Sequence, residues 1–369
     1  MSHKKKIGFV IGTLSSGGAE RVISTLSNSL IERFDITIIT FAKSTPFYAL
    51  DNRIKVIPCR EKVNKPKSAF DSLKLNYGLV KRISKISKQE EIDILIGFIT
   101  SANILTVLAS RLNGIPSIIS ERNNPLVEDV PKLWEILRGL VYPKASILVL
   151  QTNGIKKLYE KKIKPDKIAI LPNPISSGLS KLRNNSIKKE KIILSVGRLD
   201  KNKCHDELIT AFYTINSNDW KVKIIGDGSK KQELTDLIKT YNLSENVEII
   251  SKVKDIDRYY NEASLFVFTS KTEGFPNALL EAMHFGLPCV STDCNFGPSD
   301  LINDGENGFL IPVNDQKALT TKLSELIHNK DLQTKFSENA KQTTEQYMSE
   351  KVVAQWEALI NKHIKTNLV

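Results

Sequence analysis

The sequence EGFPNALLEAMHFGLPCVS, residues 273–291, decides the fold, because it reads as one helix entered from a loop and followed by a short apolar run typical of a strand. Pro276 fits the first turn of a helix, where its missing N–H costs nothing, and apolar residues then continue the helix. We therefore expect Glu273 to lie in the loop before the helix and Glu281 to lie about one turn inside it.

The start of this helix is a favourable place for a phosphate group. Free backbone N–H groups and the positive end of the helix dipole meet there. The carboxylates of Glu273 and Glu281 can accept hydrogen bonds from hydroxyl groups at its margins. A phosphate beside a polyol describes a nucleotide sugar, so the segment predicts a site for one. The spacing alone also allows an amphipathic helix with two solvated glutamates.

A basic loop follows another apolar run. The sequence VGRLDKNK at 196–203 puts Arg198 and Lys203 just past the end of that run. In an α/β sheet, a strand-to-helix loop would present both side chains at the carboxyl end of the strand. Two cations at such a place could neutralise a diphosphate.

Two loops that contain glycine also follow apolar runs directly. IIGDGS at 224–229 contains Gly226, and IGTLSSGGAERV at 11–22 contains Gly17 and Gly18 at the start of a helix. A single loop of this kind is a weak signal, because glycine also serves ordinary turns. Their order along the chain carries more information than any one of them.

Taken together and in this order, these loops resemble the family-4 retaining glycosyltransferases of the GT-B fold. The family pattern includes an N-terminal GGAE loop, a GR…K segment and two glutamates separated by seven residues. The resemblance extends from about Lys5 to the end of the chain, and further segments that share it are LPNPI at 171–175, GLPCVSTDC at 286–294, GPSDLI at 297–302 and NGFLIP at 307–312. It implies an α/β protein with two doubly wound, Rossmann-like domains facing a central cleft.

The resemblance also implies a role for each matching residue. Arg198 and Lys203 would hold the donor diphosphate. Glu281 would bind the ribose hydroxyls, and Glu273 would contact the donor sugar near the reacting carbon. The expected catalytic residues are therefore Glu273, Arg198 and Lys203. Further donor-binding residues expected from the family are Gly17, Gly18, Gly226, Phe275, Pro276, Asn277 and Ala278.

No cofactor is expected beyond the nucleotide sugar, which is a co-substrate. The five histidines include no pair at the spacing of metal ligands, so a bound catalytic metal is not expected. This agrees with the family, which is expected to stabilise the leaving nucleotide diphosphate with cations and helix dipoles.

Length and composition agree with two domains. A chain of 369 residues exceeds what one hydrophobic core usually supports. Apolar runs alternate with helical stretches such as 19–32 and 101–112, which indicates parallel, doubly wound sheets. Strands are expected in the first half at 7–11, 36–41, 55–58, 94–98, 117–120 and 147–150. In the second half they are expected at 191–196, 222–225, 247–249, 265–268, 289–292 and 308–311.

The expected organisation is an acceptor-binding domain at 1–175, a nucleotide-sugar-binding domain at 176–345 and a helix at 346–369. The Pro-bearing segment 171–175 and the polar tract 176–191 are interpreted as the inter-domain linker. One face of the last helix is apolar and contains Val352, Val353, Trp356, Leu359 and Ile360. In this fold such a helix commonly packs back across the first domain. An ordinary capping helix is the alternative.

Charge is divided unequally between the two halves. Residues 1–175 hold 28 Lys and Arg against 15 Asp and Glu, a net charge of +13, whereas residues 176–369 hold 25 against 26, a net charge of −1. If the second domain holds the donor, the first handles the acceptor. A basic acceptor domain suggests an anionic substrate or surface. A nucleic-acid partner is disfavoured, because the lysines lack interleaved aromatic residues on a recognisable binding module.

Cysteine usage and hydropathy bear on location. The four cysteines show neither a paired metal spacing nor a disulfide framework, which favours the cytosol. The apolar run after the first lysines is short enough to be a first strand rather than a signal peptide. No run approaches the roughly 20 apolar residues of a spanning helix. We expect a cytoplasmic protein, peripheral on the cytoplasmic face of an inner membrane.

The segment 67–88 also predicts an anionic partner, because as a helix it would have a lysine-rich face. On a helical wheel, five lysines fall within roughly one sixth of the circumference. They are Lys67, Lys74, Lys81, Lys85 and Lys88, and the residues beside them are Phe70, Leu73, Tyr77 and Val80. Such a helix can rest on anionic lipid or bind the diphosphate of a polyprenyl-linked sugar. A solvated lysine-rich surface helix is the alternative.

The sequence gives the least information about the residues that would bind the acceptor. SERNNP at 120–125 follows a strand and offers Glu121 and Arg122 where many relatives carry a histidine near the donor sugar. That histidine is absent here. A retaining enzyme needs no strong general base if the departing phosphate takes the acceptor proton. Glu121 and Arg122 are therefore candidate acceptor contacts.

These observations favour a retaining transferase that moves a hexose or N-acetylhexosamine from a UDP-sugar to a polyprenyl-diphosphate-linked glycan. The resemblance to bacterial enzymes of lipopolysaccharide, O-antigen, capsule and lipid-linked glycan assembly supports this reading. A sugar-nucleotide epimerase or glycan phosphorylase of the same fold is a second hypothesis, weakened by the GGAE and paired-glutamate pattern. A third is a non-catalytic, membrane-bound protein that binds nucleotide sugars.

Overall fold

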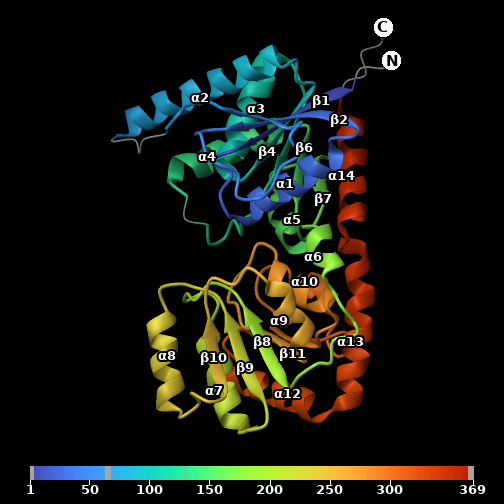
Figure 1. The fold of residues 1–369 in the computed structure, drawn as a ribbon. Coiled ribbons are helices and arrows are strands. Elements are labelled where there is room, and N and C mark those ends of the chain that lie inside the picture. The colour runs from blue at the N-terminus through green and yellow to red at the C-terminus, as the bar shows by residue number, and fades with distance from the viewer. Residues whose placement is uncertain (1–3, 63–67, 129, 365–369) are drawn as a thin grey trace. The chain divides into compact units, whose positions relative to one another are not determined.

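The computed structural model describes residues 4–62, 68–128 and 130–364, and the chain forms two compact units. Unit 1 comprises Met1–Pro174 and Ser349–Val369, and unit 2 comprises Ile175–Met348. The first unit is therefore made from two separate stretches of the chain. Figure 1 shows the elements of both units.

Unit 1 is built on a seven-stranded sheet in which every pairing is parallel, in the order β3-β2-β1-β4-β5-β6-β7. Its strands are β1 Lys5–Ile11, β2 Phe34–Thr40, β3 Lys55–Pro58, β4 Ile94–Phe98, β5 Ser117–Ser120, β6 Ile147–Leu150 and β7 Ile168–Ile170. Its helices are α1 Gly18–Leu30, α2 Ala69–Gln89, α3 Thr100–Asn113, α4 Lys132–Val141, α5 Asn153–Tyr159 and α14 Ser349–His363, with short 3₁₀ turns η1 Tyr142–Lys144 and η2 Pro165–Lys167.

Both faces of this sheet are buried, because successive side chains of a strand point to opposite faces. Along β1, Ile7, Phe9 and Ile11 belong to a core cluster shared with α1 and α14. Val10 belongs to a second cluster shared with α2 and α3. This is why the strands read as continuous apolar runs rather than as an alternation of apolar and polar residues.

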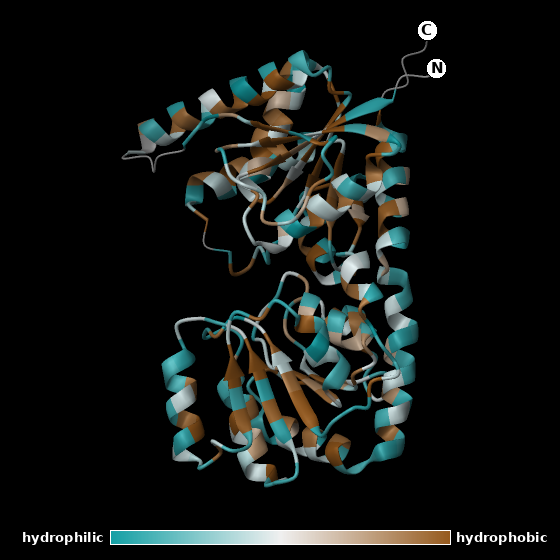
Figure 2. Cartoon of the chain, in the orientation of Figure 1, coloured by the Kyte–Doolittle hydropathy of each residue, from teal (hydrophilic) through white to brown (hydrophobic). Residues whose placement is uncertain are grey.

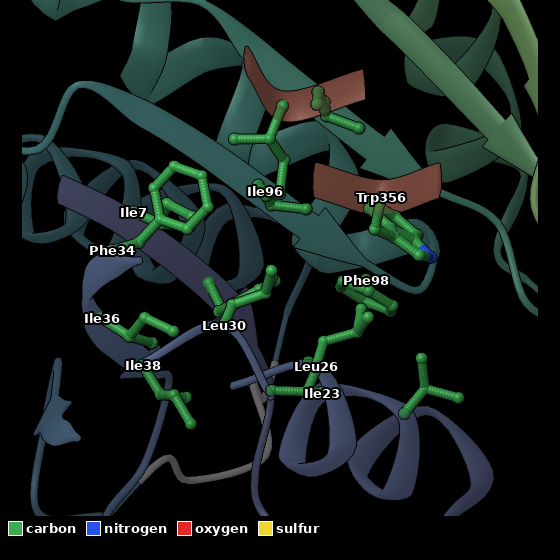
Figure 3. Close-up of a cluster of buried hydrophobic side chains, with 14 of the residues drawn as sticks. Ile7, Ile23, Leu26, Leu30, Phe34, Ile36, Ile38, Ile96, Phe98 and Trp356 are labelled. Carbon is green, nitrogen blue, oxygen red and sulfur yellow. The ribbon is translucent and has the colours of Figure 1, made fainter. Parts of the chain in front are cut away.

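The apolar face of α14 completes the first of these two cores. Trp356 has no exposed surface and stacks on Phe98 of β4, with ring centroids 5.7 Å apart. Figure 3 shows this pair among the isoleucines and leucines of the same cluster. Val352, Val353 and Ile360 are buried beside Trp356. The apolar face expected for the last helix is therefore a core face of unit 1.

Unit 2 is built on a six-stranded parallel sheet in the order β10-β9-β8-β11-β12-β13. Its strands are β8 Ile192–Val196, β9 Lys221–Ile225, β10 Val247–Ile250, β11 Leu265–Phe268, β12 Cys289–Thr292 and β13 Phe309–Ile311. Its helices are α6 Ser177–Lys181, α7 His205–Ile215, α8 Lys231–Thr240, α9 Ile256–Glu262, α10 Asn277–His284, α11 Pro298–Leu301, α12 Gln316–His328, α13 Lys330–Thr344 and the 3₁₀ turn η3 Glu345–Tyr347. In Figure 2 the strands of this sheet are largely brown, whereas α8 carries a hydrophilic face.

Twelve of these strands occupy the stretches predicted from the sequence, with ends that differ by up to two residues. Three local predictions were wrong. The sequence analysis missed β7, whose three residues are only half-buried at the edge of the sheet. The polar tract predicted to be linker contains α6, which Ser176 caps through its hydroxyl. Pro276 is the N-cap of α10 rather than a residue of its first turn.

Candidate active site

The order of strands in unit 2 defines where a ligand can bind. From β8 the chain moves outward to β9 and β10, and from β11 it moves the other way to β12 and β13. β8 and β11 are therefore the neighbours at which the winding direction reverses. In open α/β sheets, ligands bind outside the carboxyl ends of the strands at this reversal. The segments that leave β8 and β11 carry four of the predicted donor residues with charged side chains, which are Arg198, Lys203, Glu273 and Glu281.

The segment after β8 presents two cations in different environments. Arg198 is mostly exposed, and its Nη2 lies 3.3 Å from Asp200 Oδ2. Lys203 is mostly buried, and its backbone N–H donates to Asp200 Oδ1 over 3.2 Å. Asp200 thus fixes the turn that carries both cations. Lys203 also lies under the ring of Phe268, with Nζ 5.3 Å from its centroid.

Lys203 meets a carboxylate from the segment after β11. Its Nζ forms an ion pair and hydrogen bond with Glu273 Oε1. The two side chains are only 15% and 13% exposed, so the pair is shielded from solvent. The contact joins two residues predicted as catalytic from motifs seventy positions apart. A cation and an anion are therefore held together at the carboxyl ends of β8 and β11.

Backbone and polar contacts lock these two segments to each other. Asn202 Nδ2 donates to the carbonyl oxygen of Thr272 over 2.9 Å, and the N–H of Lys271 donates to the carbonyl oxygen of Asn202 over 2.8 Å. Thr269 Oγ1 donates to the carbonyl oxygen of Lys203 over 2.7 Å. The position of Lys203 is therefore set by the segment that also carries Glu273.

Helix α10 begins where this segment ends. Its N-cap, Pro276, provides no side-chain hydrogen bond to the first turn. Asn277 and Ala278 of that turn are half-buried, while the Phe275 side chain packs in the core beside Tyr347. The positive end of the helix dipole at this place favours an anion, while the N–H of Asn277 already donates to the carbonyl oxygen of Phe275 over 3.0 Å.

Glu281 lies on α10 and is largely buried. Its Oε2 accepts a hydrogen bond of 3.1 Å from the hydroxyl of Tyr260 on α9. That bond holds the carboxylate in one orientation. Sequence reasoning missed Tyr260, because nothing in its local pattern links it to a glutamate on the next helix.

Gly226 joins the site for a steric reason. A Cβ on Gly226 would overlap the carbonyl oxygen of Gly197, and one on Gly228 would overlap that of Leu199. The loop after β9 therefore lies directly against the backbone of the loop that carries Arg198. Only glycine permits this approach.

His205 begins α7, directly after Lys203 and Cys204. Its side chain is buried, and Nδ1 lies 3.2 Å from Ser195 Oγ. Burial, assisted by the charge of Lys203, lowers the pKa of His205 to about 4. The imidazole is therefore neutral near pH 7, and a second positive charge is kept away from Lys203.

The glycine loop of unit 1 occupies the corresponding reversal of its own sheet, between β1 and β4. Gly17 is the N-cap of α1 and Gly18 is its first residue. A Cβ on Gly17 would overlap the carboxylate of Glu20, which accepts a 3.1 Å hydrogen bond from Ser15 Oγ. Gly18 is exposed at the start of the helix, and the contact of this loop with a donor stays a prediction.

Glu121 requires a correction. It follows β5, but its side chain has no exposed surface. Its Oε2 accepts hydrogen bonds from the Tyr142 hydroxyl over 2.7 Å and from Thr100 Oγ1 over 3.1 Å, and burial raises its pKa. A carboxylate enclosed in this way cannot contact an acceptor in this conformation. Its role is to position the segment that leaves β5.

Arg122 is also buried, with 9% of its surface exposed. Its guanidinium lies 5.0 Å from the ring centroid of Phe98 and 5.8 Å from that of Trp356, and Nη1 donates to Asn173 Oδ1 over 2.6 Å. Burial lowers the pKa of Arg122 to about 9. Arg122 therefore ties β5 to α14, and a direct acceptor contact would require movement.

The lysines of α2 are placed as the helical wheel predicted, within the part that is described. Lys74, Lys81, Lys85 and Lys88 are exposed, as are Phe70, Leu73 and Tyr77. Lys67 lies outside the described residues. Val80 was wrongly assigned to the outer face, because it packs in the core shared by α2 and α3.

Among the residues that the structure describes, no cluster of three or more His, Cys, Asp or Glu side chains could hold a metal ion. Nor does any helix within those residues have the length and apolar character needed to cross a membrane.

Comparison with known proteins agrees with this geometry. Residues 16–178 match the family profile described as Glycosyltransferase Family 4, and residues 180–343 match the one described as Glycosyl transferases group 1. The chain is 31% identical over 362 residues, 96% of its length and 98% of the relative's, to the Campylobacter jejuni protein named GalNAc-alpha-(1->4)-GalNAc-alpha-(1->3)-diNAcBac-PP-undecaprenol alpha-1,4-N-acetyl-D-galactosaminyltransferase. The chain belongs to glycosyltransferase family 4.

This glycosyltransferase is also similar to solved structures over nearly its whole length. The glycosyltransferase from Rickettsia africae has a TM-score of 0.84 at 22% identity, with 99% of both chains covered. Anabaena HepE, solved in complex with UDP, has a TM-score of 0.79 at 18% identity, with 97% of this chain and 100% of that chain covered. Likeness at such identities shows the fold, which is two Rossmann-like domains of the GT-B type, as expected from the sequence.

Proposed function

We propose that this glycosyltransferase retains the anomeric configuration and transfers a hexose or N-acetylhexosamine from a UDP-sugar to a glycan carried on a polyprenyl diphosphate. The reaction would serve the assembly of a bacterial surface polysaccharide or lipid-linked glycan. The Campylobacter jejuni relative is named for a substrate on diphosphoundecaprenol, and HepE was solved with UDP. Both names support the proposal without deciding the sugar.

One observation carries the donor assignment. Lys203 and Glu273 come from the two segments at the reversal of the sheet and meet there, shielded from solvent. A donor that enters this place offers a diphosphate to Lys203 and sugar hydroxyls to Glu273, so both residues exchange one partner for another. Arg198, which is exposed beside them, adds a second cation for the diphosphate. Glu281, oriented by Tyr260, would accept hydrogen bonds from the ribose hydroxyls.

In the proposed reaction, the bond between the anomeric carbon and the UDP oxygen breaks as the acceptor oxygen bonds to that carbon from the same face. The acceptor proton passes to the departing diphosphate oxygen, and UDP leaves. Negative charge grows on the diphosphate as the bond breaks, and Lys203, Arg198 and the start of α10 stabilise it. These groups supply the stabilisation without a resident metal.

The acceptor side of the proposal rests on unit 1. The exposed lysines of α2 form a cationic face suited to a diphosphate or to anionic headgroups, and residues 1–175 carry a net charge of +13. An enzyme that extends a lipid-linked glycan must reach its acceptor at a bilayer surface. We therefore place the protein on the cytoplasmic face of the inner membrane as a peripheral protein.

The test is a transfer assay with radiolabelled UDP- and GDP-sugars, purified protein and bacterial membrane extract, run with and without EDTA. We expect label from one UDP-sugar to enter the lipid fraction at the same rate in EDTA. Transfer only from GDP-sugars, or loss of transfer in EDTA, would contradict the donor or the metal-independent chemistry. Donor binding without transfer to any fraction would favour a non-catalytic binder, and epimerised free donor would favour an epimerase.

A further inference from the structure

Helix α4 of unit 1 exposes an apolar face. Leu133, Ile136 and Leu140 recur at helical spacing and are 41%, 60% and 62% exposed. Val141 is the one buried residue of this helix among those described. Amphipathic helices of soluble domains normally turn such a stripe to the core. The stripe of α4 is instead left exposed on unit 1.

A pocket opens beside this stripe. It has a volume of about 590 Å³ and lies between α4, the turn η1 and the end of α5. Its apolar lining includes Leu126, Ile136, Leu140, Leu158, Tyr159 and Ile163. The volume falls within the range of about 300–1,000 Å³ that is usual for ligand pockets. Leu126, Ile136 and Leu140 are each about 60% exposed, so the mouth of the pocket is apolar as well.

The surroundings of the pocket are basic. Residues 130–167, which include α4, η1, β6, α5 and η2, carry nine Lys and Arg against three Asp and Glu. Three charged residues line the pocket itself, and they are Lys162, Arg138 and Glu135. Arg138 is paired with Glu128 over 3.0 Å and lies 4.0 Å from Glu135, so Lys162 supplies the positive charge of the lining. An apolar pocket that is lined by one such cation and lies in a basic stretch of the chain is complementary to a hydrocarbon chain that carries an anionic head.

The position of the pocket relates it to the acceptor side of the fold. Leu126 and Pro125 belong to the segment that leaves the carboxyl end of β5. Glu121, which positions that segment, hydrogen-bonds to Tyr142, and Tyr142 lines the pocket. A hydrocarbon chain in this pocket would contact Tyr142, which hydrogen-bonds to Glu121 at the carboxyl end of β5. An acceptor is expected at that end of the sheet.

We infer that this pocket binds the first isoprenoid units of the acceptor's polyprenyl chain, next to the diphosphate. The inference rests on the proposed function, because it assumes a polyprenyl diphosphate acceptor. It assigns to α4 and α5 a site for the lipid that is separate from the donor site of unit 2. The apolar mouth receives the hydrocarbon chain, and Lys162 supplies the cation for the diphosphate.

The test measures binding of soluble probes to the full-length protein by calorimetry, without any transfer reaction. The probes are farnesyl diphosphate, below the concentration at which it forms micelles, and inorganic diphosphate. The variant Ile136→Asp places a carboxylate at the pocket mouth, and Leu112→Asp is the matched control, because Leu112 is 61% exposed on α3 and does not line the pocket. We expect farnesyl diphosphate to bind wild type and Leu112→Asp equally and to bind Ile136→Asp at least tenfold more weakly. Inorganic diphosphate should bind all three alike.

Three results would overturn the inference. Unchanged affinity of Ile136→Asp for farnesyl diphosphate would remove the pocket as its site. If Ile136→Asp loses only sedimentation with phosphatidylglycerol vesicles, the stripe is a bilayer contact. If it only converts a dimer to a monomer, the stripe is an interface between copies. A fourth result separates the two proposals. If Ile136→Asp loses farnesyl diphosphate binding but the wild-type protein transfers no sugar, the pocket stands and the proposed function is rejected.

Discussion

Among single residues, Lys203 has the most constrained environment of the candidate site. Its ammonium group is held by Glu273 and lies near the Phe268 ring. Its backbone is held by hydrogen bonds to Asp200 and Thr269. Once a donor diphosphate has replaced Glu273 as its partner, a cation on so fixed a backbone needs no further reorganisation when charge develops next to it. Preorganised charge of this kind acts mainly in the transition state.

Lys203→Ala should therefore lower kcat by roughly 10²–10³-fold while changing KM for the donor much less. Steady-state transfer rates over a range of donor concentrations give both constants. Lys201→Ala, an exposed lysine in the same turn, should keep near-normal kcat. Circular dichroism should show both variants folded. Near-normal turnover in Lys203→Ala would reject the assignment of the leaving-group site.

His205 predicts a particular dependence of stability on pH. Its folded-state pKa of about 4 lies below the usual 6.5, so below pH 6.5 the unfolded chain binds a proton that the folded chain does not. The free energy of unfolding should be unaffected above pH 6.5 and fall as pH drops towards 4. His205 alone contributes about 2 kcal/mol to the fall between pH 7.5 and 5.

Urea unfolding at pH 7.5 and pH 5 checks this expectation. His205→Gln should show a smaller loss of stability between the two pH values than wild type, by about that amount. His328→Gln removes an exposed histidine of the same unit and should keep the wild-type loss. Equal losses in all three proteins would show that His205 does not remain neutral in the folded state.

Motif spacing placed Lys203 and Glu273 in loops of unit 2 but did not predict the ion pair between them. Lys203 and Glu273 could be placed because each follows an identifiable strand of the same parallel sheet. The burial of Glu121 could not be read, because its partner Tyr142 lies 21 positions along the chain and no local pattern marks it. Tyr260 is hidden for the same reason. Long-range hydrogen bonds leave no periodic trace in a sequence.

At the scale of elements, the loops after β8 and β9 act as one structure. The backbone of Gly226 lies against that of Gly197, and Gly228 lies against Leu199. The loop with Arg198 is therefore supported by the backbone of its neighbour: the N–H of Leu199 donates to the carbonyl oxygen of Asp227, and the N–H of Lys230 donates to that of Leu199, each over 2.9 Å. The close fit of these two loops therefore positions Arg198 together with its charged neighbours.

Gly226→Ala should destabilise the protein by about 1–3 kcal/mol, because its methyl group overlaps a carbonyl oxygen and one loop must move. The same shift should weaken UDP binding, since Arg198 lies on the displaced loop. Urea unfolding and calorimetric titration with UDP measure the two effects. Gly178→Ala, on α6 with no atom near the added methyl group, should leave both values close to wild type. Wild-type stability in Gly226→Ala would show that the loops separate freely.

The strands could be predicted almost completely, because strands buried on both faces are continuous apolar runs between glycine and proline. The exceptions have physical causes. β7 has three residues at the sheet edge, too few for a pattern, and α6 is a single capped turn in a polar tract. Val80 was misplaced because a helical wheel gives relative angles but does not show which side packs.

For the molecule as a whole, the unequal charge is the main long-range feature. The excess of Lys and Arg over Asp and Glu lies entirely within residues 1–175. The exposed lysines of α2 concentrate part of this excess on one helix face. Attraction to an anionic bilayer should depend on that face and weaken as salt is added.

The triple variant Lys74→Gln, Lys81→Gln and Lys85→Gln should reduce partitioning onto phosphatidylglycerol vesicles by about 100-fold at low salt, at about 1 kcal/mol for each lysine. Vesicle co-sedimentation measures the partition coefficient. The control replaces three exposed lysines of unit 2, Lys221, Lys239 and Lys317, with glutamine and should bind like wild type. Equal losses in the two variants would mean that total charge, rather than α2, controls binding.

The participation of α14 in unit 1 has a consequence for how the chain folds as it is made. Trp356 covers Phe98 and contacts Arg122, yet the ribosome must synthesise all of Ile175–Met348 before Trp356 exists. At about 5–20 residues per second this interval lasts on the order of 10–30 s. Throughout it the nascent first unit has an open core face while unit 2 is being synthesised. The core of the first unit can therefore close only after the whole second unit has been made.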